Sequence, residues 1–338
     1  MVARCAQSKV EMTEAVLSVR DLRVEFSTRH GTLVALDGVS FDIAPGEVLG
    51  MVGESGAGKS LTGSAIIGLL EPPGRTTGGE ILLRGRRIDN LPASEMRGIR
   101  GKRIGMVFQD PLTSLNPLYT IAEQLIETIR THQSLTASQA RLRAIELLDR
   151  VGIPAAARRI DDYPHHFSGG MRQRVVIALA LCADPELVIA DEPTTALDVS
   201  VQAQIIDLIK EICAEKGAAV LLITHDMGVI AETADRVAVL YAGRLAEVGP
   251  TQDIIRDPRH PYTRGLMGSI PTLTQNATRL VQIPGAMPRL SDIPAGCAFN
   301  PRCPNVTDHC RTARPSLMPL QAFREVACWQ ADKEGPND

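Results

Sequence analysis

The feature that most constrains this chain is a glycine-rich loop at residues 53–60, with the sequence Gly-Glu-Ser-Gly-Ala-Gly-Lys-Ser. It fits the phosphate-binding pattern G-x-x-x-x-G-K-[ST] without a mismatch. The short apolar run at residues 47–52 predicts a buried strand before the loop, and residues 61–70 predict a helix after it. A glycine-rich turn that matches by chance would lack these flanks, so the sequence predicts a nucleoside triphosphate site.

Each part of the loop has an expected role in holding the nucleotide. The glycines let backbone N–H groups surround an anion, and the positive end of the following helix dipole points at it. Lys59 is expected to reach the β- and γ-phosphates, and the Ser60 hydroxyl is expected to bind Mg²⁺. The predicted nucleotide-binding residues of the loop are Gly53, Glu54, Ser55, Gly56, Ala57, Gly58, Lys59 and Ser60.

Composition limits the class of protein further. A length of 338 residues predicts about two domains, and a hydrophobic fraction of 44% permits a sizeable core. The formal net charge of −3, with both signs mixed along the chain, gives no electrostatic case for nucleic-acid binding. The longest apolar run, residues 175–183, is too short for a membrane span, and no secretory signal is apparent. We expect a cytosolic protein that contacts a membrane only through partners.

The residues before the loop alternate between apolar and polar, which predicts an antiparallel, half-buried sheet. Its four short strands are expected at residues 15–19, 22–26, 33–36 and 39–43. Phe26 is the aromatic residue expected to stack on the base, with a purely structural place in the core as the alternative.

Beyond the loop helix, a hairpin is predicted at residues 78–85 and a strand at 103–108, which ends at Gln109. Two helices are expected at residues 121–131 and 138–151, and they form a helical insert.

Two later segments carry further chemistry. Ser168, Gly169 and Gly170 open an apolar helix, and a helix N-terminus is a second place for an anion. A buried strand then ends at Asp191 and Glu192, which are placed to bind Mg²⁺ through water and to activate an attacking water. The alternative for two adjacent carboxylates is a solvated turn.

A further strand is expected at residues 219–226, and it carries His225 near its end. At this place His225 can contact a γ-phosphate. The alternative for a lone histidine there is a structural role.

The order of these elements resembles the ATPase subunit of an ABC transporter over about residues 17–266. The matching motifs are Walker A (53–60), the Q-loop (Gln109), the signature (168–170), Walker B (187–191), the catalytic Glu192, the D-loop (196–198, including Asp198) and the switch His225. Phe167 and Met171 depart from the commonest signature but leave its Ser and Gly groups unchanged.

The resemblance implies an α/β fold: a P-loop, RecA-like core with an antiparallel β subdomain and a helical signature subdomain. It implies ATP with Mg²⁺, the metal being held by Ser60, Gln109 and Asp191, and it adds Gln109, Asp198 and the signature residues to the nucleotide contacts.

The same resemblance implies partners. A second, related ATPase subunit is expected to face this one, with ATP between the loop of one and the signature of the other. Two transmembrane permeases and an extracytoplasmic substrate-binding protein complete the expected complex, at the cytoplasmic face of the inner cell membrane. Gln109 is expected to relay closure to the permeases.

Residues 163–165, 260–266 and 296–304 are similar to ATPases of oligopeptide and dipeptide importers. The expected division is a flexible leader (1–13, with Met12 as an alternative start), a nucleotide-binding domain (14–266, helical subdomain about 110–183) and a Cys- and Pro-rich C-terminal extension (267–338).

Four cysteines of that extension, Cys297, Cys303, Cys310 and Cys328, have five, six and seventeen residues between them. In a cytosolic chain such a cluster favours metal over disulfides, although no pair has the spacing typical of structural zinc. The peptide-importer resemblance implies a [4Fe–4S] cluster, with zinc and free thiols as alternatives.

Other functions remain to be weighed. Cargo is selected by the binding protein and the permeases, so nickel, glutathione or an antimicrobial peptide is an alternative cargo. A soluble ABC ATPase acting on ribosomes or DNA is less favoured, because the chain has one cassette and a short insert. A scaffold with a dead nucleotide site is disfavoured by intact Lys59, Asp191, Glu192 and His225.

Overall fold

The computed structural model describes residues 14–193, 199–268, 283–321 and 323–331. These residues form two sheets, of four and eight strands, with helices packed around them. The expected leader at 1–13 and the D-loop residue Asp198 lie outside the described residues. No helix in the described ranges is long and apolar enough to cross a bilayer.

The first sheet is antiparallel, as expected. Its strands are β1 (Leu17–Thr28), β2 (Gly31–Ile43), β4 (Gly74–Leu83) and β5 (Arg86–Arg87), in the order β2-β1-β4-β5. Two long strands replace the four short ones expected before the loop, because β-bulges interrupt the register without ending either strand. One such irregularity includes Asp21, which has a positive φ of 47°.

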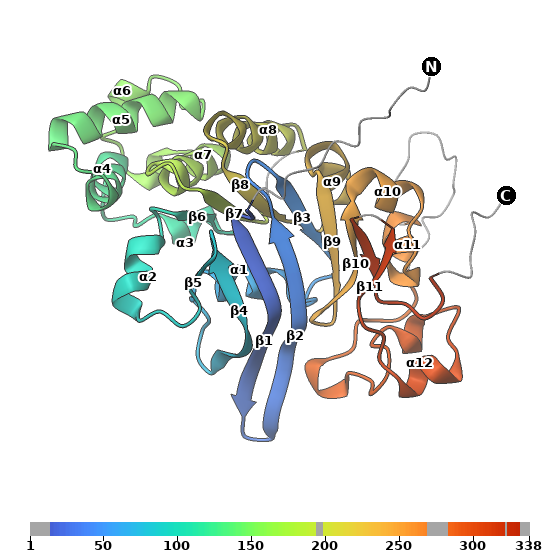
Figure 1. Cartoon of the computed structure of the whole chain (residues 1–338). Coiled ribbons are helices and arrows are strands. Elements are labelled where there is room, and N and C mark those ends of the chain that lie inside the picture. The colour runs from blue at the N-terminus through green and yellow to red at the C-terminus, as the bar shows by residue number, and fades with distance from the viewer. Residues whose placement is uncertain (1–13, 194–198, 269–282, 322, 332–338) are drawn as a thin grey trace, which may run out of the picture.

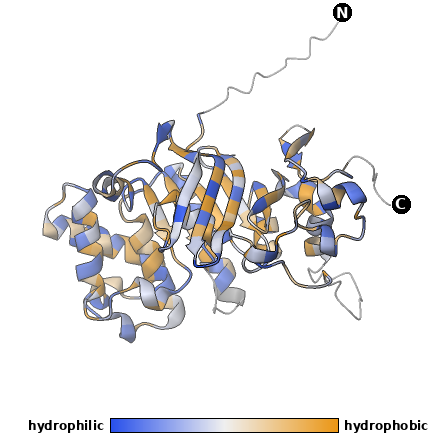
Figure 2. Cartoon of the chain, turned by 90° about the horizontal axis from the view of Figure 1, so that it is seen from below, coloured by the Kyte–Doolittle hydropathy of each residue, from blue (hydrophilic) through white to orange (hydrophobic). Residues whose placement is uncertain are grey.

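The second sheet is parallel at its centre. Its strands are β3 (Val48–Val52), β6 (Ile104–Val107), β7 (Leu187–Asp191), β8 (Ala219–Ile223), β9 (Arg236–Tyr241), β10 (Arg244–Pro250), β11 (Met318–Gln321) and β12 (Arg324–Val326). The order is β11-β12-β10-β9-β3-β8-β7-β6. Every residue of β3, β7 and β8 is buried, which explains their unbroken apolar sequences. Figure 2 shows apolar residues gathered in the strands at the middle of the molecule.

The helices of the insert begin where the sequence places them. The helices up to the signature are α1 (Lys59–Ile66), α2 (Ala93–Ile99), α3 (Pro111–Ser114), α4 (Ile121–His132), α5 (Ala137–Arg150), α6 (Ala156–Arg159) and α7 (Gly169–Leu181). Thr120 and Thr136 start α4 and α5 with capping boxes. The first helix, α1, is shorter than expected and is followed by Gly68 at a φ of 63°.

The remaining helices are α8 (Val199–Lys216), α9 (Met227–Thr233), α10 (Thr251–Arg256), α11 (Pro261–Gly268) and α12 (Asp308–Thr312), with 3₁₀ turns η1 (Pro164–His166), η2 (Leu290–Asp292) and η3 (Asn300–Arg302). Helices α4 to α6 lie at one end of the molecule, and α12 with its neighbouring segments lies at the other (Figure 1).

The described residues from 283 to 331, here called the C-terminal region, are joined to the second sheet. Strand β12 pairs antiparallel with β10, and a buried ion pair crosses the junction. Arg324 Nη2 lies 2.7 Å from Glu247 Oε1, with the two side chains 2% and 0% exposed. Glu247 also accepts from the backbone N–H groups of Arg259 and His260. The C-terminal region is therefore part of the second sheet and is held to it by strand pairing and by a buried ion pair.

Replacing Arg324 by Met should lower the free energy of unfolding by about 3–5 kcal/mol, because the buried Glu247 carboxylate loses its guanidinium partner. Urea denaturation followed by circular dichroism measures the loss. Arg314→Met is the matched control. Arg314 pairs with Asp37 at 3.0 Å but is 37% exposed, so its loss should cost less than about 1 kcal/mol. Equal losses in the two variants would contradict the account.

Burial lowers the pKa of His260 to about 4. The unfolded chain binds a proton at about pH 6.5 and the folded chain does not, so stability is full above that pH. The free energy of unfolding should fall as the pH drops from about 6.5 to 4, by up to about 1.4 kcal/mol per pH unit. We expect His260→Asn to flatten this part of the plot of unfolding free energy against pH. The measurement is the unfolding free energy of the wild type and of the variant at each pH. Parallel profiles for the two proteins would show that His260 is not the group responsible.

Candidate nucleotide site

The parallel strands place the predicted site residues at one edge of the sheet. The loop at 53–60 follows β3, Gln109 follows β6, Glu192 follows β7 and His225 follows β8. In open α/β sheets, ligands bind outside the carboxyl ends of the strands. The fold therefore brings together residues that are up to 172 positions apart, from Gly53 to His225.

The loop conformation requires glycine at two positions. Gly53 has a φ of 156°, and a Cβ there would lie 2.2 Å from the carbonyl oxygen of Leu240. Gly58 has a φ of 107°, and its Cβ would lie 2.7 Å from a methyl group of Leu36. Both places combine a left-handed backbone with close packing, which an L side chain cannot satisfy.

The ammonium of Lys59 lies inside the loop. Its Nζ donates to the carbonyl oxygens of Gly53, at 2.8 Å, and Glu54, at 3.2 Å. The residue is only 5% exposed. Burial lowers the pKa of Lys59, while the charges of Glu192 and Asp191 oppose the shift. A cation is thus already fixed where the phosphates are expected.

The Ser60 hydroxyl meets a carboxylate at the end of β7. Ser60 Oγ donates to Asp191 Oδ1 at 2.8 Å. Burial raises the pKa of Asp191, and the hydrogen bond from Ser60 opposes this. A hydroxyl beside a carboxylate is a hard oxygen donor set, which suits Mg²⁺.

Two further predicted residues, Gln109 and His225, meet at the carboxylate of Glu192, which is itself a predicted site residue. Gln109 Nε2 donates to Glu192 Oε2 at 3.0 Å, and His225 Nδ1 lies 3.3 Å from Glu192 Oε1. The backbone of Glu192 is strained, with a φ of 44°, and its N–H donates to Ile223 at 2.8 Å. Strain of this kind in a non-glycine residue concentrates at functional sites.

Lys59, Ser60, Gln109, Glu192 and His225 line one open cavity of about 580 Å³, and Asp191 is not among its described lining residues. Its lining residues are Phe26, Ala35, Ser55, Gly56, Gly58, Lys59, Ser60, Leu61, Gln109, Glu192, His225 and Leu290. Phe26 is half-buried, so it both lines the cavity and packs on the core. Sequence reasoning missed Ala35, Leu61 and Leu290 as lining residues. Leu290 lies 230 positions beyond Ser60, and no local pattern marks it.

The signature residues are elsewhere. Ser168 is the N-cap of α7, and its hydroxyl accepts from the Met171 N–H. Ser168 and Gly169 are exposed, and neither is among the described residues that line the nucleotide cavity. The predicted second anion site therefore faces outward from the single chain.

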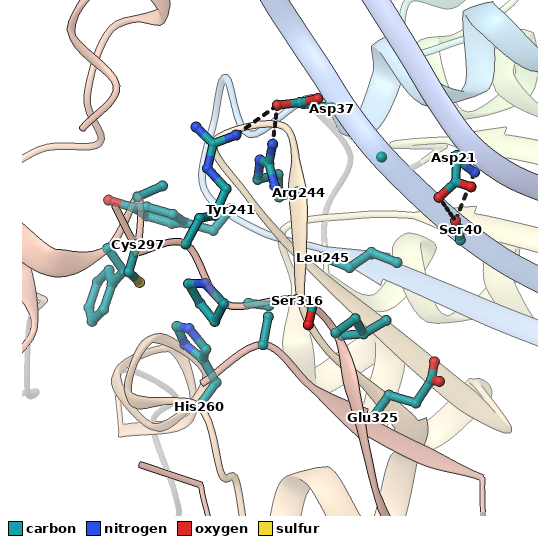
Figure 3. Close-up of a pocket in the computed structure, with 18 residues that line it drawn as sticks. Asp21, Asp37, Ser40, Tyr241, Arg244, Leu245, His260, Cys297, Ser316 and Glu325 are labelled. Atoms are coloured by element: carbon teal, nitrogen blue, oxygen red, sulfur yellow. Dashed lines mark hydrogen bonds and ion pairs between the residues drawn. The ribbon is translucent and has the colours of Figure 1, made fainter. Parts of the chain in front are cut away.

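A separate cavity of about 410 Å³ lies between β2, β10 and the C-terminal region (Figure 3). At one end Asp37 accepts from Arg244 and Arg314, and at the other Asp21 and Ser40 are hydrogen-bonded. It shares no lining residue with the nucleotide cavity among the residues described. The ion pair between Arg314 and Asp37 joins the C-terminal region to the first sheet.

The iron–sulfur prediction is wrong. Cys297, Cys303, Cys310 and Cys328 do line one small cavity. However, no group of three or more His, Cys, Asp or Glu within the described ranges is arranged to hold a metal ion. This overturns the [4Fe–4S] cluster and leaves its zinc alternative without support. Burial raises the pKa of Cys297 to about 11 and also raises those of Cys303 and Cys328. Neutral, buried thiols pack as small apolar side chains.

Three features together define a P-loop nucleotide site. They are a glycine-rich loop around a buried lysine, a serine–aspartate pair, and a strained glutamate held by a glutamine and a histidine. Comparisons with known proteins narrow this class. Residues 36–195 match the family model "ABC transporter", and residues 246–310 match "Oligopeptide/dipeptide transporter, C-terminal region".

The chain is 49% identical over 321 residues to the dipeptide transport ATP-binding protein DppD of Bacillus subtilis. The match covers 95% of this chain and 96% of that protein. It is 46% identical over 314 residues to DppD of Escherichia coli, and this match covers 93% of the chain and 96% of that protein. A dimeric structure of the ATP-binding cassette MJ0796 with ADP and Pi has a TM-score of 0.63 and 29% identity, and covers 70% of this chain and 98% of that one. The chain belongs to the ABC transporter family and is an ATPase, and its expected cassette fold is confirmed.

Changing Glu192 to Gln should preserve ATP binding and lower turnover by about 10²–10⁴-fold, because the carboxylate that is predicted to accept a proton from the attacking water is lost. Phosphate release by the assembled transporter measures this. Glu186→Gln is the matched control: Glu186 pairs with Arg103 at 2.6 Å beside the opposite end of β7, and turnover should stay unchanged. Full turnover in the Glu192 variant would exclude the role.

Lys59→Ala should instead weaken nucleotide binding, because it removes the charge held in the loop. Isothermal titration with ATP and Mg²⁺ separates the two effects. Wild-type affinity in the alanine variant would contradict the assignment of the loop.

Proposed function

We propose that this chain energises the import of dipeptides and oligopeptides through a membrane ABC transporter. The observation that carries the proposal is likeness along nearly the whole chain to dipeptide transport ATP-binding proteins, including the C-terminal region. The ATPase fold alone does not specify a cargo. The cargoes nickel, glutathione and antimicrobial peptide draw no support from these relatives and are not proposed.

The residues of the site take the following proposed roles. The loop and Lys59 bind the phosphates, Phe26 packs on the base, and Ser60, Gln109 and Asp191 hold Mg²⁺, which neutralises phosphate charge. Their support is the cavity that Phe26, Lys59, Ser60 and Gln109 line together, and the contact of 2.8 Å between Ser60 and Asp191. The roles of Asp198 and the signature rest on their motifs alone.

Glu192 is the proposed base. Its carboxylate is 15% exposed and opens into the nucleotide cavity, where it can accept a proton from water. Gln109 and His225 hold the two oxygens of this carboxylate, so its direction is fixed before the nucleotide arrives. His225, 66% exposed, is free to turn from Glu192 toward a γ-phosphate.

A second, related ATPase subunit is proposed to complete the site. The outward-facing Ser168 and Gly169 supply an anion site that the cavity of the same chain does not use. A partner subunit placed head to tail brings its signature to the nucleotide cavity of this chain, and the signature of this chain reaches the cavity of the partner. A related cassette has been solved as a dimer, which supports the arrangement.

Contact with the permeases is proposed at an apolar groove beside Gln109. The groove encloses about 520 Å³ between β6, α3, α4 and α7, and its lining includes Ile67, Leu69, Met106 and Phe108. Leu69 and Phe108 are 44% and 42% exposed, so each offers unburied apolar surface. A short helix from a permease fits such a groove, and Phe108 is joined to Gln109 by one peptide bond. Closure around ATP is thereby passed to the membrane.

The proposed complex also contains two permeases and an extracytoplasmic binding protein, with this chain at the cytoplasmic face of the membrane. Its proposed organisation is a nucleotide-binding domain at 14–266, with a helical subdomain at about 110–183, and an extension at 267–338.

Replacing Leu69 by Glu should remove most of the permeases from the affinity-purified complex, because a charge enters the apolar groove. ATP affinity should not change. Leu142→Glu is the matched control, since Leu142 on α5 is 62% exposed and lies outside the groove. Retention of the permeases by the Leu69 variant would reject this surface.

ATP-driven uptake of labelled dipeptide into vesicles that contain the purified complex tests the cargo. Uptake of nickel or glutathione in place of peptide would reject the cargo. Recovery of the chain with ribosomes and without membrane proteins would reject the importer assignment.

A further inference from the structure

A buried arginine of the C-terminal region contacts the phosphate-binding loop. Arg302, at the end of η3, is 6% exposed. Its Nη1 and Nη2 donate to Glu54 Oε2 and Oε1, at 2.9 and 3.0 Å. The pair joins residues 248 positions apart. Bidentate, charge-assisted contacts of this kind are strong and directional.

Arg302 is fixed by its own surroundings. Its Nε donates to the carbonyl oxygen of Pro284 at 2.8 Å, and its Nη1 lies 3.4 Å from the Tyr241 hydroxyl. The guanidinium carbon is 5.9 and 5.8 Å from the ring centres of Tyr241 and Phe299. The side chain therefore keeps its position without help from a nucleotide.

Glu54 is held through each of its polar groups. Its N–H donates to the hydroxyl of Tyr262 at 2.8 Å, and its carboxylate receives Arg302. Its carbonyl oxygen accepts from Lys59 Nζ at 3.2 Å. Glu54 thus connects Arg302 to the lysine that faces the phosphates. Tyr262, which is fully buried, comes from the segment 260–266 that the sequence singled out without a role.

The same region covers the loop at two more points. The terminal methyl of Met287 is 3.1 Å from the place that a Cβ of Gly56 would take. Leu290 lines the nucleotide cavity itself. The C-terminal region therefore contacts the loop and its cavity through three side chains: Met287, Leu290 and Arg302.

Two consequences follow for nucleotide binding. A loop that is already fixed loses less conformational freedom when the phosphates bind. In addition, the Glu54 carboxylate belongs to an anion-binding loop, where an uncompensated negative charge would repel phosphate. The guanidinium of Arg302 neutralises it. Both effects apply to ATP and ADP alike, so they act on affinity more than on the chemical step.

We propose that Arg302 is a positioning residue of the ATPase site, through which the C-terminal region holds the phosphate-binding loop ready for nucleotide. The proposal rests on the proposed role of the loop and is independent of the cargo.

The test measures dissociation constants of the full-length chain for ATP with Mg²⁺ and for ADP. Arg302→Gln should weaken both by about fivefold or more, while kcat of the assembled transporter at saturating ATP stays within about twofold. Glu54→Gln removes the charge that Arg302 neutralises. In that background Arg302→Gln should therefore have much less effect, which a double-mutant cycle detects. Arg302→Lys should recover part of the affinity.

Arg314→Gln is the matched control. It removes another arginine–carboxylate pair between the C-terminal region and the rest of the chain, on Asp37 of β2 and not on the loop itself. Its affinity for ATP should equal that of the wild type. Equal losses in the Arg302 and Arg314 variants would overturn the proposal in favour of general support by the region. Unchanged affinity in a folded Arg302→Gln protein would also overturn it.

Lys59→Ala distinguishes this failure from failure of the loop assignment. Loss of affinity in Lys59→Ala with none in Arg302→Gln rejects only the present proposal, and no loss in Lys59→Ala rejects the role of the loop. A measurement on the unaltered chain gives a second test. By linkage, ATP with Mg²⁺ should slow backbone amide exchange at residues 285–302, and unchanged exchange there would count against the coupling.

Discussion

A loop that binds phosphate with its own backbone N–H groups cannot also use them to hold itself in shape. Side chains of the loop and of its neighbours have to fix its conformation. Here the buried ammonium of Lys59 bonds to two carbonyls of the loop, and Leu240 and Leu36 leave no space for side chains at Gly53 and Gly58. The parallel strands that position the loop also position Gln109, Asp191, Glu192 and His225. The site is thus a product of sheet order more than of any one motif.

The sequence predicts most of this edge because each motif follows a strand whose apolar run is visible. Phe26, Lys59, Gln109, Glu192 and His225 were all assigned from local pattern, and all line one cavity. Their chemical roles stay predictions. What local pattern cannot show is a contact between distant segments: neither Leu290 nor Arg302 follows a motif that points to the loop. The long strands β1 and β2 were divided in two because a bulge and a turn look alike in sequence.

The cysteines of the C-terminal region show a second limit. Spacing and resemblance predicted metal ligands, yet the four thiols lie in a small buried space without an arrangement for a metal ion in the described part of the chain. Residue type and separation do not give the directions of side chains. Burial keeps such thiols neutral, and a neutral thiol packs as a small apolar side chain.

Strand β12 has a consequence for the outer edge of the second sheet. Without the C-terminal region, β10 would present a row of unpaired backbone groups to solvent, and edge strands of this kind pair with other chains. Among the residues that the structure describes, this edge is β11, a strand of four residues that carries Pro319. Proline at an edge removes a donor and discourages further pairing. A cassette shortened at residue 266 would therefore tend to aggregate, so the smallest soluble unit of this protein extends well past its last ATPase motif.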